Sequence, residues 1–207
     1  MAGGIEVDDT NAKEESREDI FIYTVAGWMA FASATLLVPY IVLSLIMDFN
    51  PRATHTLLPI IVLIAIIQMV CSIFAFIKFR DLLNERYNFH DIDNLVPILI
   101  LGGIFIMAVA LAGRAFPALK IPMLVLLIVS AIPVSIVGII YGVRLLRLKA
   151  KLHGLLKPLA YTHIIASIFF LTLILAVLGL LTMAAFDVML GLLFLQGREE
   201  DGAVDFV

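Results

Sequence analysis

The sequence has few charged side chains and almost no cysteine. Only 15% of its 207 residues are Asp, Glu, Lys or Arg, whereas 62% are hydrophobic, and the net charge is −3. A typical soluble domain is about 25% charged and about 45–50% apolar, so a soluble fold of this length could not bury so much apolar surface. The lone Cys71 excludes a disulfide framework and a paired-thiol metal site. The composition therefore predicts an integral membrane protein.

Motifs of the common catalytic and nucleotide-binding families are also absent. The chain contains no Walker, Rossmann, zinc-ligand or nucleophile-elbow pattern. Its four histidines, His55, His90, His153 and His163, lie at or near predicted membrane boundaries, and His55 lies on the opposite side from the others. A bis-histidine haem is therefore not expected. We predict that the protein is not an enzyme, and we expect no catalytic residue, no cofactor and no metal site.

Long apolar runs are the main feature that the sequence does contain. A helix needs about 20 apolar residues to cross about 30 Å of hydrocarbon. Isolated strands are excluded there because each backbone N–H and C=O group must be bonded within the segment. We expect an all-α, polytopic membrane helix bundle, with five transmembrane helices near residues 20–47, 57–79, 95–113, 121–144 and 162–186 and a short apolar segment at 188–196.

The end of the chain leaves two alternatives open. Between residues 158 and 196 the only Asp, Glu, Lys, Arg or His side chains are His163 and Asp187. In the five-span interpretation, 162–186 is one helix, Asp187 caps the short apolar segment, and His163 lies about 36 Å from Asp187 along the helix axis. In the six-span alternative, a turn near Gly179 returns the chain, and the two residues still lie at different depths. Five spans are favoured because the stretch around Gly179 lacks Pro, Asn and Asp.

Two acidic tails flank the bundle, which we expect to cover residues 19–196. Residues 1–18 are predicted to be a flexible tail, and 197–207 form a second tail. Basic residues beside membrane spans stay on the cytoplasmic side. When residues 141–158 are placed inside and five helices alternate, ten Lys and Arg residues lie inside and three lie outside. We therefore expect a cell-membrane protein with a cytoplasmic N-terminus.

The stretch 141–158 is the most basic part of the chain. It can continue the fourth helix along the membrane surface, where basic residues attract an acidic leaflet. Nucleic acid is not an expected partner, because only Tyr141 and Tyr161 could stack on bases. The residues predicted to contact anionic lipid headgroups are Arg144, Arg147, Lys149, Lys151 and Lys157.

A few polar residues near the middle of the runs suggest a site at the bilayer midplane. Pro133 lacks an N–H and so frees the carbonyl of Val129, which another group must satisfy in hydrocarbon. The amide of Gln68 lies at the matching depth and is expected to donate to that carbonyl or to Ser130. The candidate midplane residues are Gln68, Ser72, Ser130, Pro133 and Ser135.

Small residues recur at a spacing that lets helix backbones approach closely. Ala26, Ala30 and Ala34 recur every four positions, and Gly138 and Gly142 form a GxxxG pair. Packing within the bundle is favoured over a dedicated homo-oligomer face. These features favour a non-catalytic membrane subunit or scaffold that packs against another membrane protein or a second copy. The alternative is a small transporter or channel with a polar site at the midplane.

Overall fold

The protein is an all-helical bundle, which confirms the fold class expected from the sequence. The computed structural model describes residues 6–148, 154–172 and 175–203. Within these ranges the helices are α1 (Glu6–Phe49), α2 (Thr54–Tyr87), α3 (Leu95–Ala115), α4 (Lys120–Leu145), α5 (Leu156–Thr172) and α6 (Ala176–Ala203), with short 3-10 turns at Pro51–Ala53 and Pro117–Leu119. Five segments are long and apolar enough to cross a membrane: Ile20–Phe49, Thr54–Tyr87, Leu95–Ala115, Pro117–Leu145 and Ala176–Gln196. The remaining helix, α5, is apolar but shorter than these five segments.

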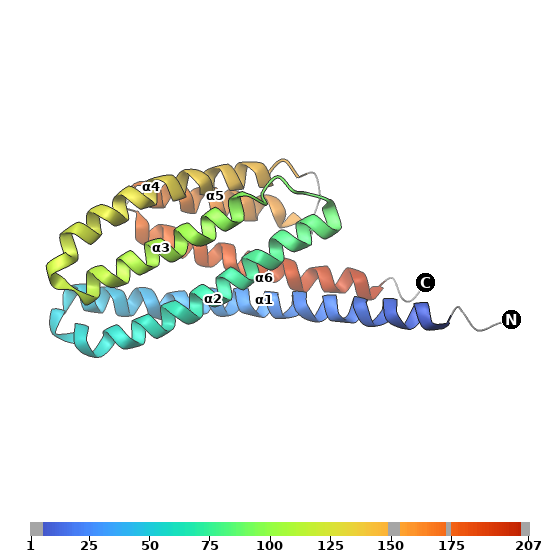
Figure 1. Ribbon diagram of the computed structural model, residues 1–207, viewed down its shortest axis with the longest axis horizontal. Helices are drawn as coiled ribbons and strands as arrows, with labels where there is room; N and C mark the ends of the chain where they lie inside the picture. The colour runs from blue at the N-terminus through green and yellow to red at the C-terminus, as the bar shows by residue number, and fades with distance from the viewer. Residues whose placement is uncertain (1–5, 149–153, 173–174, 204–207) are drawn as a thin grey trace.

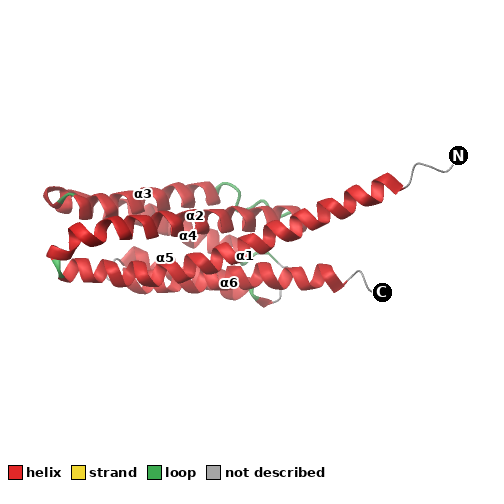
Figure 2. Ribbon diagram, turned by 90° about the horizontal axis from the view of Figure 1, so that it is seen from below, coloured by secondary structure: helices red, strands yellow, loops and turns green. Residues whose placement is uncertain are grey.

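The six helices form a ring in which each helix packs against the next one in the chain. The ring closes because α6 returns to pack along α1, and the α2–α3 contact is the loosest of the six. Both the start of α1 and the end of α6 lie at one end of the bundle, together with the loop between α2 and α3 (Figure 1). The α1–α2 and α3–α4 connections lie at the opposite end (Figures 1 and 2).

The α2–α3 loop has a defined local structure. Asn88 ends α2 in the left-handed conformation (φ 48°), and its N–H bonds to the carbonyl of Asn84. Asparagine tolerates this conformation better than most residues and is a known helix terminator. Ile92 of the loop is fully buried, and Arg144 of α4 donates a hydrogen bond to the carbonyl of Asp91 at 2.6 Å. The loop therefore joins α2, α3 and α4 at this end.

The C-terminal part of the bundle differs from the five-span interpretation. The segment 162–186 is not one continuous helix, because α5 ends at Thr172 and α6 begins at Ala176. The six-span alternative placed the turn near Gly179, but this residue is helical, and Phe170 of α5 lies about 3.1 Å from where its Cβ would be. Gly179 thus lets the two helices approach each other. Tertiary packing, not a turn-forming residue, makes this hairpin.

The α5–α6 hairpin does not extend along the whole length of α4. Gly138 of α4 lies beside Ser167 of α5, and the two helices run in opposite directions. Continuing this register, the last residue of α5, Thr172, is level with Pro133. Pro133 is about 20 Å along the axis from the start of α4 at Lys120. Residues 120–130 of α4 consequently have no α5 beside them and contain no buried residue.

The segments predicted as an N-terminal flexible tail and a C-terminal acidic tail are partly helical. Helix α1 begins at Glu6, so most of 1–18 is helical, and α6 continues to Ala203. No glycine or proline lies between residues 5 and 26, so nothing in the sequence breaks the helix before the first span.

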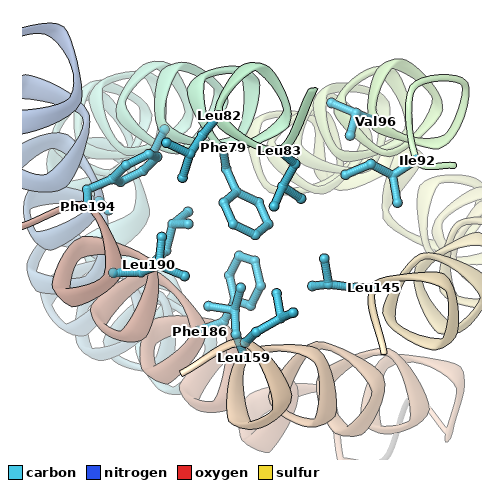
Figure 3. Packing of buried hydrophobic residues seen from close by; sticks show 14 of the residues in the cluster. Phe79, Leu82, Leu83, Ile92, Val96, Leu145, Leu159, Phe186, Leu190 and Phe194 are labelled. Carbon is cyan, nitrogen blue, oxygen red and sulfur yellow. The ribbon is translucent and has the colours of Figure 1, made fainter. Parts of the chain in front are cut away.

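The main hydrophobic core lies in the half of the bundle nearer the chain ends. Figure 3 shows Phe79 and Leu83 of α2, Leu145 of α4 and Phe186 of α6 pointing toward one another, and each is at most 1% exposed. A second, smaller cluster around Leu37 joins α1 and α2 nearer the other end. The first cluster positions the polar groups described next.

Candidate functional site

Two neighbouring buried polar side chains of the main core have no hydrogen-bond partner among the described residues, as is also true of the Ser44 hydroxyl in α1. The two neighbours are His163, in the middle of α5, and Tyr141, in the last turns of α4. His163 is 5% exposed and Tyr141 is fully buried. Neither ring nitrogen of His163 nor the hydroxyl of Tyr141 finds a donor or acceptor in the described part of the chain. The great majority of buried polar groups in proteins are bonded, so three orphaned atoms in one place are unusual.

Aromatic rings from α2 and α6 pack around His163 and Tyr141. The His163 ring lies 4.8 Å from the Tyr141 ring and 5.0 Å from Phe186 of α6, measured between centroids. Phe76 of α2 lies 5.2 Å from Tyr141 and 6.2 Å from His163. The site is therefore built by four helices, α2, α4, α5 and α6. We call His163, Tyr141, Phe76 and Phe186 the aromatic site.

The GxxxG pair of α4 creates the room for the aromatic site. A Cβ on Gly138 would collide with the hydroxyl of Ser167 and lie 3.4 Å from Nε2 of His163. A Cβ on Gly142 would lie 3.0 Å from the carbonyl of Ala160. The two glycines thus face α5, as close helix approach requires. The expectation that this pair serves packing within the bundle agrees with these contacts.

The polar atoms of the aromatic site can form hydrogen bonds without carrying charge. A neutral imidazole has one N–H donor and one nitrogen acceptor, and a phenol both donates and accepts. Leaving each such group unpaired in a core costs about 1–3 kcal/mol. The arrangement suits a small polar molecule that donates to one group and accepts from another. The surrounding rings would shield that molecule from lipid.

A second polar pair, Asp187 and Ser33, lies beside the aromatic site, because Asp187 directly follows Phe186 in α6. Asp187 is 3% exposed, and the hydroxyl of Ser33 on α1 donates a 2.7 Å hydrogen bond to its Oδ2. Asp187 lies inside α6, so it does not cap a separate apolar helix at 188–196 as expected from the sequence. The expected 36 Å separation is also wrong, because His163 contacts Phe186, the residue before Asp187. Folding α5 back on α6 brings the two levels together.

The predicted midplane residues do not meet as expected. Gln68 is half-buried, and its Oε1 has no partner among the described residues. Val129 is 60% exposed, and the hydroxyl of Ser130 donates to the carbonyl of Leu127 within its own helix. Helices α2 and α4 are not neighbours in the ring. The described residues thus contain no bond from Gln68 to Val129 or Ser130.

The other members of that predicted set are spread over different surfaces. Ser135 is buried on the same face of α4 as Gly138, whereas Pro133 is exposed. Ser72 is half-buried on α2. A role for Gln68, Ser72, Ser130, Pro133 and Ser135 as a polar site stays a prediction, without the hydrogen bond that motivated it.

The predicted lipid-contacting residues have different surroundings. Arg144 is half-buried and is held by the α2–α3 loop, whereas Arg147 and Lys157 are exposed. Lys149 and Lys151 lie outside the described residues. Contact of the exposed residues with anionic headgroups stays a prediction.

Sequence reasoning missed the aromatic site because it assigned every histidine to a membrane boundary. Because the helix ends at Thr172, His163 lies in the core. Residues 173–175 include no Pro, Gly, Asn or Asp that would predict this break. Asp187 did carry a signal, since an ionisable residue inside a membrane helix marks a functional site by default. The GxxxG pair also pointed to the face of α4 on which the site lies.

Chemistry that needs a cluster of metal ligands has no support in the described ranges. There, no group of three or more His, Cys, Asp or Glu side chains is placed to hold a metal ion. Comparison of the chain with protein-family models, curated proteins and solved structures finds no match.

Proposed function

We propose that the protein is a small multi-pass transporter or channel for a neutral polar solute, and that the solute binds at the aromatic site. The observation that carries this proposal is the set of three orphaned polar atoms on His163 and Tyr141. A purely structural core gains nothing from unpaired groups, because an apolar side chain of similar shape would be more stable there. A binding site retains them for its ligand.

The short α5–α6 hairpin supports the same proposal. Its outer end lies level with Pro133, within the length of α4, which is long enough to cross the membrane. Interrupted helices at membrane depth are tolerated where they are buried in protein or line a water-filled cavity. Transporters place substrate sites beside such breaks.

The orientation that we propose is a cytoplasmic N-terminus in the cell membrane. The positive-inside rule supports it. Of the described basic side chains between Ile20 and Gln196, those near the end that carries the α2–α3 loop are Lys78, Arg80, Arg86, Arg144, Arg147 and Lys157, whereas Arg52, Arg114 and Lys120 lie near the other end. Because α6 ends beside the start of α1, an epitope after Val207 should resist protease added outside intact cells. Cleavage there would contradict this threading.

Cysteine accessibility tests the proposed solute site. In a Cys71→Ala background, Ser167→Cys places a thiol beside Gly138 and His163, and a small water-soluble thiol reagent should modify it. Ala166→Cys is the matched control, because Ala166 is fully buried on the same helix and should not react. Lys157→Cys, on the exposed start of α5, should react fully. An unreactive Ser167→Cys would mean that the aromatic site is dry and would contradict the proposal.

A second candidate function is the non-catalytic membrane subunit expected from the sequence. The observation that favours it is the exposure of residues 103–130, which we call the far hairpin. Leu124 and Val125 are each 55% exposed, and nothing lies within 4 Å of the Cβ position of Gly103. A partner helix, a second copy of the chain or lipid would cover this surface. Cross-linking from a cysteine at position 103 to another chain would favour the subunit over the transporter.

A further inference from the structure

Asp187 is an acidic group in the apolar part of α6 without a positive partner among the described residues. The ion pairs formed there involve Asp81 and Asp93, both near the α2–α3 loop. The only hydrogen bond of the Asp187 side chain in the described part of the chain comes from the Ser33 hydroxyl. An ionised carboxylate with one such bond is costly in a water-poor core, whereas a protonated one is not.

The helices packed against α6 contribute no basic side chain at this level. Helix α6 packs on α1, α5 and α2. From α1 the facing group is the Ser33 hydroxyl, which donates to Asp187. Helix α2 contributes the thiol of the buried Cys71. Helix α5 contributes His163, which lies against Phe186. Lys and Arg are absent from residues 20–47, 56–77 and 158–196.

A metal cation is a poor occupant for this pair. Calcium takes six to eight oxygen ligands, and magnesium requires near-octahedral coordination. Asp187 and Ser33 provide two side chains with oxygen, and Cys71 and His163 are ligands of a different kind. A proton needs only the carboxylate. The Ser33 hydroxyl can rotate, so it donates to the ionised carboxylate and accepts from the protonated one.

We propose that Asp187 is a reversible proton-binding site within the membrane bundle, and that the Ser33 hydroxyl stabilises both of its protonation states. The site adjoins the aromatic site through Phe186 and His163, so a proton bound at Asp187 is placed to couple to solute binding. This coupling role rests on the proposed function. Proton binding at Asp187 does not, because it can be measured without transport.

Infrared difference spectroscopy tests the proton site directly. The spectrum of the wild-type protein minus that of Asp187→Asn, in lipid vesicles, should contain the carbonyl stretch of a neutral carboxylic acid in acidic buffer. This band should fade reversibly as the buffer becomes alkaline. Asp91→Asn, which changes an exposed carboxyl on the α2–α3 loop, is the matched control, and the band assigned to Asp187 should persist in it.

The same question can be asked with a hydrophobic carbodiimide, which adds to a protonated carboxyl and rearranges to a stable N-acylurea adduct. Mass spectrometry should locate the adduct on Asp187 in acidic buffer, with less adduct in alkaline buffer. The infrared band needs no reagent access, so it decides the case if no adduct forms. A band that is constant or absent at every pH would overturn the proposal. Loss of the band on adding sodium at fixed pH would also overturn it, because it would indicate a cation.

The two proposals fail in different ways. An unreactive thiol at position 167 with a titrating Asp187 band would remove the solute site and the coupling role but leave the proton site. A reactive thiol with a band that does not titrate would leave the solute site and remove the proton site.

Discussion

The two halves of α4 are similarly apolar but differ completely in burial. The buried residues of the half 131–145 are Ala131, Ser135, Gly138, Tyr141, Gly142 and Leu145. Of these, Gly138, Tyr141 and Gly142 lie against α5. Residues 120–130 belong to the far hairpin with α3 and contain no buried residue. Hydrophobicity does not separate the halves, because lipid is as apolar as the core. Small and polar residues do separate them, since they permit close backbone approach and bonding between helices.

The two halves of α4 also differ in whether they can contribute to a functional site. The packed half of α4 holds Tyr141 against His163, with Phe76 and Phe186 around them. The exposed half presents Leu and Val side chains, and its hydroxyl, on Ser130, is used within its own helix. A site needs polar groups held by several helices, so only the packed half can contribute one.

Glycine substitutions should give the largest and most contrasting effects. In Gly142→Ala the new Cβ meets Ile164 and the Ala160 carbonyl, so overpacking should lower the free energy of unfolding by about 1–3 kcal/mol. Gly103→Ala in the far hairpin meets nothing within 4 Å and should raise it by about 0.5–1 kcal/mol, because alanine favours helix. Denaturant titration in mixed micelles measures both. Equal effects of the two substitutions would show that the packed half of α4 and the far hairpin do not differ in packing.

The hydroxyl of Tyr141 provides a test with the opposite sign. Tyr141→Phe removes a buried group that lacks a partner, so the unliganded protein should become more stable by about 1 kcal/mol. Tyr161→Phe is the control, because Tyr161 is 55% exposed on α5 and should change stability little. A destabilised Tyr141→Phe would show that the hydroxyl is bonded in the protein. Thermal unfolding in detergent would reveal it.

Serine substitutions should have smaller effects on stability than the glycine and tyrosine substitutions. Ser33→Ala removes the donor to buried Asp187, and interhelical hydrogen bonds in membranes contribute about 0.6 kcal/mol on average. Ser130→Ala removes a bond within one turn of the exposed half of α4, so its effect should be smaller. Double-mutant cycles with Asp187→Asn should show coupling for Ser33 and none for Ser130. The unfolding free energies of the single and double variants give that coupling.

The sequence was sufficient to predict the helical membrane bundle and most helix positions. Continuous apolar runs define spans because backbone bonding in lipid leaves few alternatives. The glycine pair at 138 and 142 was also informative, since its spacing predicts close packing and the structure places α5 against it. The apolar runs and the glycine spacing depend only on residues close together in the sequence, so they can be predicted from it.

The hairpin and the aromatic site could not be predicted in the same way. The break between Thr172 and Ala176 contains no proline, asparagine or aspartate, so it depends on contacts such as that of Gly179 with Phe170. If residues 162–186 form one long helix, His163 and Asp187 are separated by their distance along it. The site depends on which helices are neighbours, and five helices of similar hydrophobicity do not reveal this.

The smallest predicted effect concerns the loop that anchors the packed half of α4. Burial alone would raise the pKa of Asp93, but hydrogen bonds from Asn84 and His90, together with the charges of His90 and Arg80, outweigh it and lower the pKa below its ordinary value of 3.8. The two bonds measure 2.7 Å and 2.9 Å. Because the pKa is lower in the folded protein, the stabilisation is present above pH 3.8 and is lost as the pH falls through the lowered value.

Asp93→Asn isolates this contribution. The unfolding free energies of the wild type and the variant should differ slightly at neutral pH, and the difference should shrink in strongly acidic buffer, where the wild-type carboxyl is protonated. The same acidification should weaken the hold of the loop on Arg144, which donates to the Asp91 carbonyl. A spin label or fluorophore on the exposed Val143 would then report greater mobility at the end of α4. A pH-independent difference would mean that Asp93 acts through its shape, and the packed half of α4 would not depend on that charge.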